Sequence, residues 1–134
     1  MYCIDASVLV SAIRIHERDS KSCIALLEKI LTEETIVYLP EIALVEIVSA
    51  MVRATGNATF ARSIAKAFRS LSNYVFLPVD RELADFTTEI IMRTNLRSGD
   101  AMYVAVAAIY RVPLVTLDRE QLERGALFVE TRLP

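Results

Sequence analysis

The sequence predicts an α/β domain built on a mainly parallel β-sheet. Short apolar runs alternate with longer stretches in which apolar residues recur at helical spacing. The 134 residues suit a single compact domain spanning 1–134, and a hydrophobic content of 54% argues against disorder. Because helices separate the strands along the chain, we expect βαβ crossovers and a sheet covered by helices on both faces.

Four apolar runs predict strands, and a fifth run near the C-terminus predicts a last edge strand. The expected strands are 2–5, 35–39, 74–77, 114–117 and 127–129. The helical spacing predicts helices at 6–14, 20–32, 41–54, 58–72, 81–94 and 99–110, with a short helical turn at 119–124. Asp80 and Ser98 are the expected N-caps of the helices that follow them, because short polar side chains accept hydrogen bonds from free N–H groups there.

Composition excludes several classes of function. A net charge of −2 and a pI of about 5.4 argue against a general DNA-coating protein, which needs a basic face. Arginine nevertheless outnumbers lysine twelve to three, and arginine favours bidentate contacts with phosphate. No uncharged run approaches the roughly 20 residues that span a bilayer, and we expect no signal peptide. Cys3 and Cys23 lie in apolar patterns and are expected to be reduced, which favours a cytoplasmic location.

Four acidic residues lie beside segments that are otherwise apolar, namely Asp5, Glu46, Asp100 and Asp118. Each has an ordinary interpretation. Asp5 and Asp118 follow predicted strands and precede helices, where they can serve as N-caps or turn residues. Glu46 can reach solvent from a helix edge, and Asp100 can be stabilised by the dipole in the first turn of its helix.

Taken together, the four acids favour a shared cation. An ionised carboxylate is costly to bury without a partner, and Glu46 has no opposite charge on its own helix face. Asp5 and Asp118 stand at predicted strand C-termini, the edge where active sites of parallel sheets lie. Carboxylate oxygens suit Mg²⁺ or Mn²⁺. Zinc is not expected, because the only histidine, His16, lies in a polar loop and is interpreted as a solvated residue.

The order and spacing of these acids resemble those of PIN-domain ribonucleases, including the VapC-like toxins of type II toxin–antitoxin pairs. The likeness covers essentially the whole chain. The segments that carry it are Ile4-Asp5-Ala6-Ser7, Leu39-Pro40-Glu41 followed by Val45-Glu46, Leu96-Arg97-Ser98-Gly99-Asp100-Ala101, and Leu114-Val115-Thr116-Leu117-Asp118. No one of these motifs is specific by itself.

The resemblance implies a three-layer α/β/α PIN-like fold with a parallel sheet of four or five strands in the order 3-2-1-4-5. It also implies a metal-dependent endoribonuclease that hydrolyses RNA phosphodiester bonds and acts as the toxin of a toxin–antitoxin pair. In such an enzyme Asp5, Glu46, Asp100 and Asp118 would be catalytic and would hold Mg²⁺ or Mn²⁺.

Further residues and partners follow from the same resemblance. Ser7 and Thr116 are the expected supporting hydroxyls, and Arg14, Arg53 and Arg97 are candidates for contacts with substrate phosphates. The implied partners are an RNA substrate, a second copy of the chain in a homodimer, and a small cognate antitoxin.

Two alternatives stay open. Phosphoacceptor receivers and haloacid-dehalogenase-like phosphatases also place an Asp after the first strand, but they use a lysine from a later strand end. The three lysines here, Lys21, Lys29 and Lys66, all lie in predicted helices. The second alternative is a catalytically silent PIN module that acts as an RNA-binding or protein-interaction scaffold, and the presence of all four acids argues against it.

Overall fold

The sheet is parallel throughout, and its five strands lie in the order β3-β2-β1-β4-β5. The computed structural model describes residues 1 to 134. The strands are β1 (Tyr2–Ile4), β2 (Val37–Pro40), β3 (Tyr74–Leu77), β4 (Leu114–Val115) and β5 (Thr131–Arg132). The predicted order 3-2-1-4-5 is therefore confirmed, with the first strand of the chain at the centre.

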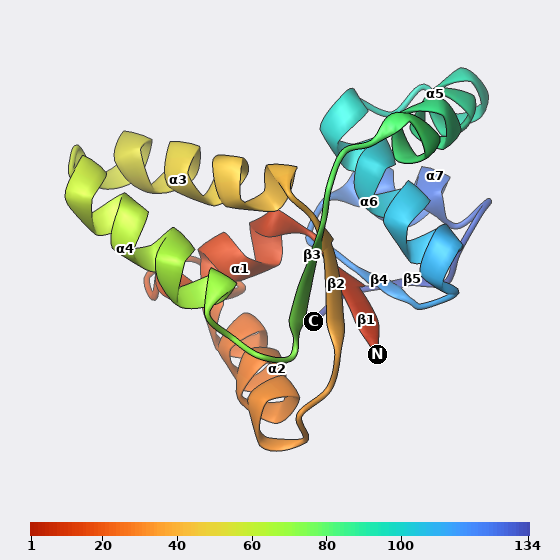
Figure 1. Cartoon of the computed structure of the whole chain (residues 1–134). Coiled ribbons are helices and arrows are strands. Elements are labelled where there is room, and N and C mark those ends of the chain that lie inside the picture. Colours follow the sequence, from red (N-terminus) through yellow and green to blue (C-terminus); the bar gives the residue numbers. More distant parts are fainter.

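Helices cover both faces of this sheet. They are α1 (Ala6–Ile13), α2 (Ser20–Thr32), α3 (Ile42–Thr55), α4 (Ala58–Arg69), α5 (Arg81–Thr94), α6 (Ser98–Tyr110) and α7 (Arg119–Gly125). Figure 1 shows α1 to α4 on one side of the central strands and α5 to α7 on the other. The three-layer arrangement is thereby confirmed. None of these helices combines the length and the apolar character that crossing a membrane requires.

Helix α6 has more buried residues than any other helix of the domain. Its sequence carries no charge between Asp100 and Arg111, and Ala101 and the run Tyr103–Ala107 are buried. The helix packs against β1, β2 and β4. An apolar surface on all sides of a helix is expected only where the helix is surrounded by other elements. Asp100, in the first turn of α6, is therefore held by one of the most rigid parts of the domain.

The strand predicted at 127–129 is wrong, because that segment forms a turn after α7. The backbone N–H groups of Phe128 and Val129 donate to the carbonyl of Gly125, at 2.9 and 3.1 Å, and so are not free for a ladder. The side chains of Phe128 and Val129 pack against the core instead, and Leu127 is exposed. The fifth strand comes later, with Thr131 opposite Leu114 on β4.

The end of β4 and the start of α6 also differ from what the sequence predicted. Strand β4 ends at Val115. Thr116 N–H still donates to the Arg132 carbonyl at 3.1 Å, but the N–H groups that follow turn to side chains: Leu117 N–H donates to the Ser7 hydroxyl at 3.3 Å and Asp118 N–H to the Thr116 hydroxyl at 2.9 Å. Ser98 is the first helical residue of α6 rather than its N-cap. The capping position falls on Arg97, whose side chain makes no capping hydrogen bond.

The expected N-cap of α5 is confirmed and gives a test of the fold. The Asp80 carboxylate accepts a hydrogen bond from Leu83 N–H at 2.9 Å. We expect Asp80→Ala to lower the free energy of unfolding by about 1 kcal/mol in urea titrations, because a helical N–H loses its partner. Asp85→Ala makes the same charge change at an exposed position of α5 and should cost less than about 0.5 kcal/mol. Equal losses in the two variants would contradict the cap.

Candidate active site

The site begins where β1 and β4 end side by side. Ile4 pairs with Val115, and Asp5 N–H donates to the Val115 carbonyl at 2.9 Å. Asp5 is the N-cap of α1 and is only 6% exposed. Its Oδ2 accepts hydrogen bonds from the Ser7 N–H at 3.3 Å, from the Ser7 hydroxyl, and from the Thr116 hydroxyl at 3.2 Å. Burial raises the pKa of Asp5, and these hydrogen bonds oppose that rise because they favour the charged carboxylate.

Asp118 stands at the same edge and is linked to Asp5 through Thr116. The Thr116 hydroxyl donates to Asp5 and accepts from Asp118 N–H, and the residue is fully buried. The Asp118 carboxylate caps α7 by accepting from Gln121 N–H at 2.8 Å. The capping interpretation of both aspartates is thus correct, and both also face the site described below. Thr116 and Ser7, the expected supporting hydroxyls, both donate to the Asp5 carboxylate.

Glu46 reaches the site from the middle of α3. It is half-buried, and its Oε2 accepts a hydrogen bond from the Tyr103 hydroxyl at 2.6 Å. Burial raises the pKa of Glu46, the Tyr103 hydrogen bond lowers it, and the charge of Asp5 raises it further. Glu46 therefore does not extend to open solvent, which was its ordinary interpretation.

Asp100 projects from the first turn of α6, and its pKa is raised. Burial first, and then the negative charges of Asp118, Asp5 and Glu46, together raise its pKa to about 6. Arg97 acts in the opposite direction. The Gln121 amide donates to both the carbonyl and the Oδ1 of Asp100, each at 3.3 Å. An aspartate that feels three other carboxylates is in an electrostatic environment that a cation would relieve.

The four acids line one cavity of about 520 Å³, together with Ser7 and Arg53. None of the four takes part in a salt bridge. Arg53 is the one predicted arginine in the lining. Arg97 is exposed just outside it, and Arg14 is paired with Glu17 and lines a different cavity beside His16.

The donor chemistry of the cavity fits a hard divalent cation, because it offers carboxylate and hydroxyl oxygens and no histidine or cysteine. The carboxylates are not yet gathered around one point, and no three acidic, histidine or cysteine side chains stand close enough to hold an ion. Like charges at short range disfavour one another, which opposes a tighter cluster of carboxylates without a cation. Binding an ion would therefore require these side chains to rotate inward.

Three residues of the site were not predicted from the sequence. Tyr103 lies one turn after Asp100 on the same helix face, but in the sequence it could not be distinguished from an ordinary core aromatic residue. Gly99 lies against Glu46. Gln121 follows the N-cap Asp118 by three residues, the spacing of a capping box, and this was the one available signal. Its fully buried Oε1 has no hydrogen-bond partner.

Comparisons with known proteins agree with this geometry. The PIN domain family matches residues 2–127, so the chain belongs to the PIN domain family, a family of nucleases. No curated protein sequence matches the chain.

Among solved structures, the chain is similar to three toxin–antitoxin proteins, and at these identities the likeness concerns the fold. The sarcin–ricin-loop-cleaving toxin VapC20 of Mycobacterium tuberculosis has a TM-score of 0.78 at 18% identity, over 98% of this chain and 99% of that chain. VapBC2 of Rickettsia felis, bound to a promoter DNA fragment, has a TM-score of 0.73 at 16% identity, over 99% of this chain and 98% of that chain. A toxin–antitoxin complex of Klebsiella pneumoniae has a TM-score of 0.63 at 15% identity, over 91% of this chain and 90% of that chain.

The raised pKa of Asp100 predicts how stability varies with pH when metal is chelated. The native state binds a proton more tightly than the unfolded chain, so the free energy of unfolding should rise as pH falls from above about 6 toward 3.8. Asp100→Asn removes this group and should raise stability at pH 7.5 by about 1 kcal/mol, a figure reduced for the screening of a half-buried group. Thermal melting in EDTA between pH 7.5 and 5 measures both effects.

The matched control is Asp85→Asn, at an exposed position of α5. This variant should keep the pH dependence of the native chain, whereas Asp100→Asn should make the dependence weaker, with the raised pKa values of Asp5 and Glu46 accounting for what is left. An Asp100→Asn chain with an unchanged slope would show that Asp100 does not carry the perturbed titration.

Proposed function

We propose that this chain is a metal-dependent endoribonuclease that hydrolyses RNA phosphodiester bonds and works in the cytoplasm as the toxin of a toxin–antitoxin pair. One observation supports the nuclease activity above all: four acidic side chains from four different parts of the sequence line a single cavity, and none has a cationic partner. Membership of the PIN domain family points to the same chemistry. The two cysteines are unpaired and buried, as suits a reducing compartment.

The proposal assigns the acids to one site for Mg²⁺ or Mn²⁺. When bound, such an ion lowers the pKa of a water molecule and neutralises charge on the phosphate oxygens. Asp5 and Asp100 would be its main ligands, and Asp118 would bind directly or through water. Glu46 would be a ligand or would orient the attacking water.

The other residues of the site serve these acids. Ser7 and Thr116 hold the Asp5 carboxylate from one side by donating to Oδ2. Arg53 lies in the cavity wall with no acidic partner and is the best placed of the predicted arginines to contact a phosphate. Arg97, just outside the wall, and Arg14, engaged with Glu17, stay weaker predictions for that role.

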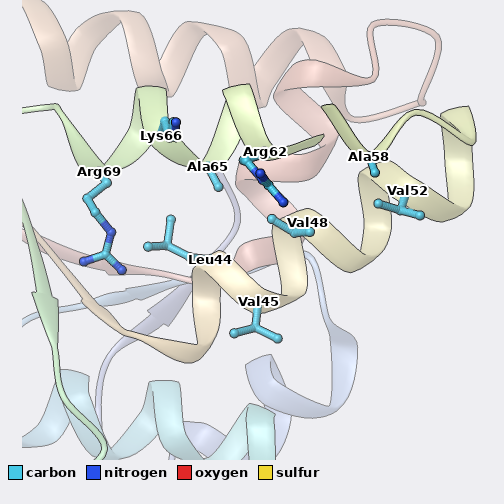
Figure 2. A pocket seen from close by; sticks show the side chains of 9 residues that line it. All are labelled: Leu44, Val45, Val48, Val52, Ala58, Arg62, Ala65, Lys66 and Arg69. Carbon is cyan, nitrogen blue, oxygen red and sulfur yellow. The ribbon is translucent and has the colours of Figure 1, made fainter. Parts of the chain in front are cut away.

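The protein partner we propose is a small antitoxin, and a groove between α3 and α4 supports it. This groove, of about 460 Å³, is lined by Leu44, Val45, Val48, Val52, Ala58, Arg62, Ala65, Lys66 and Arg69. Figure 2 shows Arg62 of α4 reaching toward Val48 of α3 and Arg69 toward Leu44, whereas Val45 points away from α4. Arg69 is paired with Glu41, whereas Arg62 and Lys66 are exposed and form no salt bridge.

An apolar floor with unpaired positive charges along one wall suits an amphipathic segment that carries acidic residues beside its apolar stripe. A second copy of the chain placed over the same groove by a two-fold axis would bring like charges together. The homodimer implied by the resemblance is therefore expected to use another surface. Its existence stays a prediction.

RNA cleavage with a defined single-stranded or structured substrate tests the proposed activity. We expect cutting with Mg²⁺ or Mn²⁺ and none with EDTA. Asp100→Asn should lower the rate by at least about 100-fold, because loss of residues that merely support metal ligands already costs about 10- to 100-fold. The variant should keep its fold, measured by its melting temperature in EDTA.

Asp85→Asn is the control and should cut at the native rate. A native chain that binds RNA equally well with and without metal, and never cuts it, would instead identify the silent PIN module. Full activity of Asp100→Asn would remove Asp100 from the catalytic set.

A search for a small reading frame directly upstream, followed by co-expression of its product with the chain, tests the antitoxin proposal. We expect that product to co-purify with the chain and to inhibit cleavage. Val52→Asp, in the groove, should abolish co-purification by placing a charge in an apolar contact. Leu127→Asp, at a 69% exposed position outside the groove, should leave it intact. Absence of such a reading frame, or capture that Val52→Asp leaves unchanged, would contradict the proposal.

A further inference from the structure

Helix α6 contributes two residues besides Asp100 to the surroundings of the site, and both lie against Glu46. Gly99 and Tyr103 are four residues apart, so they occupy the same helix face one turn from each other. Each meets a different oxygen of the Glu46 carboxylate. Glu46 has several rotatable bonds and sits on another helix, so its carboxylate needs such contacts to stay in one place.

Tyr103 supplies a directed contact. Its side chain is fully buried in the core, and its hydroxyl donates to Glu46 Oε2 at 2.6 Å. A buried hydroxyl without a partner is costly, so the ring and the carboxylate each depend on the other's position. A hydrogen bond to an ionised acceptor is also stronger than one between neutral groups.

Gly99 supplies space. A Cβ atom at this position would lie 2.9 Å from Glu46 Oε1, closer than real Cβ contacts allow, so the flexible end of the Glu46 side chain would have to move away. Backbone conformation does not demand glycine here, since Gly56 is the only glycine with a positive φ. Alanine would favour the helix more than glycine does. The absence of a side chain at residue 99 is therefore explained by the room it leaves for the Glu46 carboxylate.

We propose that Gly99 and Tyr103 are positioning residues that hold Glu46 in its working orientation beside Asp5 and Asp100. The proposal rests on the proposed nuclease function. Neither residue lines the cavity, so both act through Glu46. Tyr103 fixes Oε2 by its hydrogen bond, and Gly99 allows Oε1 to lie close to the first turn of α6.

A double-mutant cycle tests the role of Tyr103. Tyr103→Phe keeps the ring and removes only the hydroxyl, and we expect cleavage to slow about ten-fold or more through kcat, with KM little changed. In a Glu46→Ala background the same substitution should cause no further loss, because the residue through which it acts is gone. Equal fold losses in both backgrounds would overturn the proposal.

The matched control is Tyr74→Phe. Tyr74 is also buried, and its hydroxyl makes no hydrogen bond with the four acids. This variant should cut at the native rate. A loss equal to that of Tyr103→Phe would show that removal of any buried hydroxyl slows the enzyme, and would overturn the proposal.

Gly99→Ala gives an independent test. The spacing role predicts slower cleavage in the native background although alanine favours the helix, and a purely structural role would not produce that combination. In the native background the added methyl group should displace Glu46 and slow cleavage about ten-fold, although alanine improves the helix. In the Glu46→Ala background the clash is absent, so the melting temperature should rise and the residual rate should not change. A rate unchanged by Gly99→Ala in the native background would overturn the spacing role.

A thermal cycle separates failure of this proposal from failure of the nuclease function. Tyr103→Phe should lower the melting temperature of the native chain and should not lower that of Glu46→Ala, where the hydroxyl has already lost its acceptor. This coupling is measured from melting temperatures and does not require the chain to cut RNA. If the native chain never cuts RNA, the nuclease function fails and the catalytic role of both residues fails with it. If the chain cuts RNA and the thermal coupling is zero, the positioning role alone is overturned.

Discussion

The candidate site depends on the pairing of β1 with β4. These strands are far apart in the sequence, and the Asp5–Thr116 hydrogen bond joins residues 111 positions apart. The register in which Ile4 faces Val115 brings the first residue beyond each strand, Asp5 and Thr116, to the same edge of the sheet. Because side chains alternate between faces, a slip of one residue would direct Thr116 away from Asp5. The hydroxyl that connects Asp5 to Asp118 would then be lost.

At this edge of the sheet, the same strand-to-helix turns both cap the helices and bring negatively charged carboxylates close together. A strand that ends at the sheet's carboxyl edge and turns into a helix places its last polar residue at the N-cap, as Asp5 and Asp118 both show. A carboxylate has acceptor positions for about four hydrogen bonds, so capping uses only part of its capacity. The capping hydrogen bonds fix the two carboxylates without neutralising them. The ordinary and the functional interpretations of these residues are therefore compatible.

The sequence was sufficient to predict most of the fold and the four acids, for identifiable physical reasons. Apolar runs at strand or helix spacing reflect burial, and burial decides where β1, β3 and α5 lie. The prediction of a strand at 127–129 was wrong because apolar residues in a turn can pack against the core without pairing. Tyr103 was missed because a core aromatic and a carboxylate-binding tyrosine occupy the same kind of position in a helix. Only the distance to Glu46 distinguishes them, and that distance depends on how α3 and α6 pack.

Helix α3 connects the acidic cavity with the apolar groove. Glu46, Ala50 and Arg53 face the cavity, whereas Leu44, Val48 and Val52 face the groove. Val45 lines both and is 66% exposed, so the two hollows share a border one residue wide. A segment seated in the groove would bury Val45 and thereby cover the edge of the cavity next to Glu46. The neighbouring faces of one helix thus provide a physical route by which a protein bound outside the active site could obstruct access to the carboxylates.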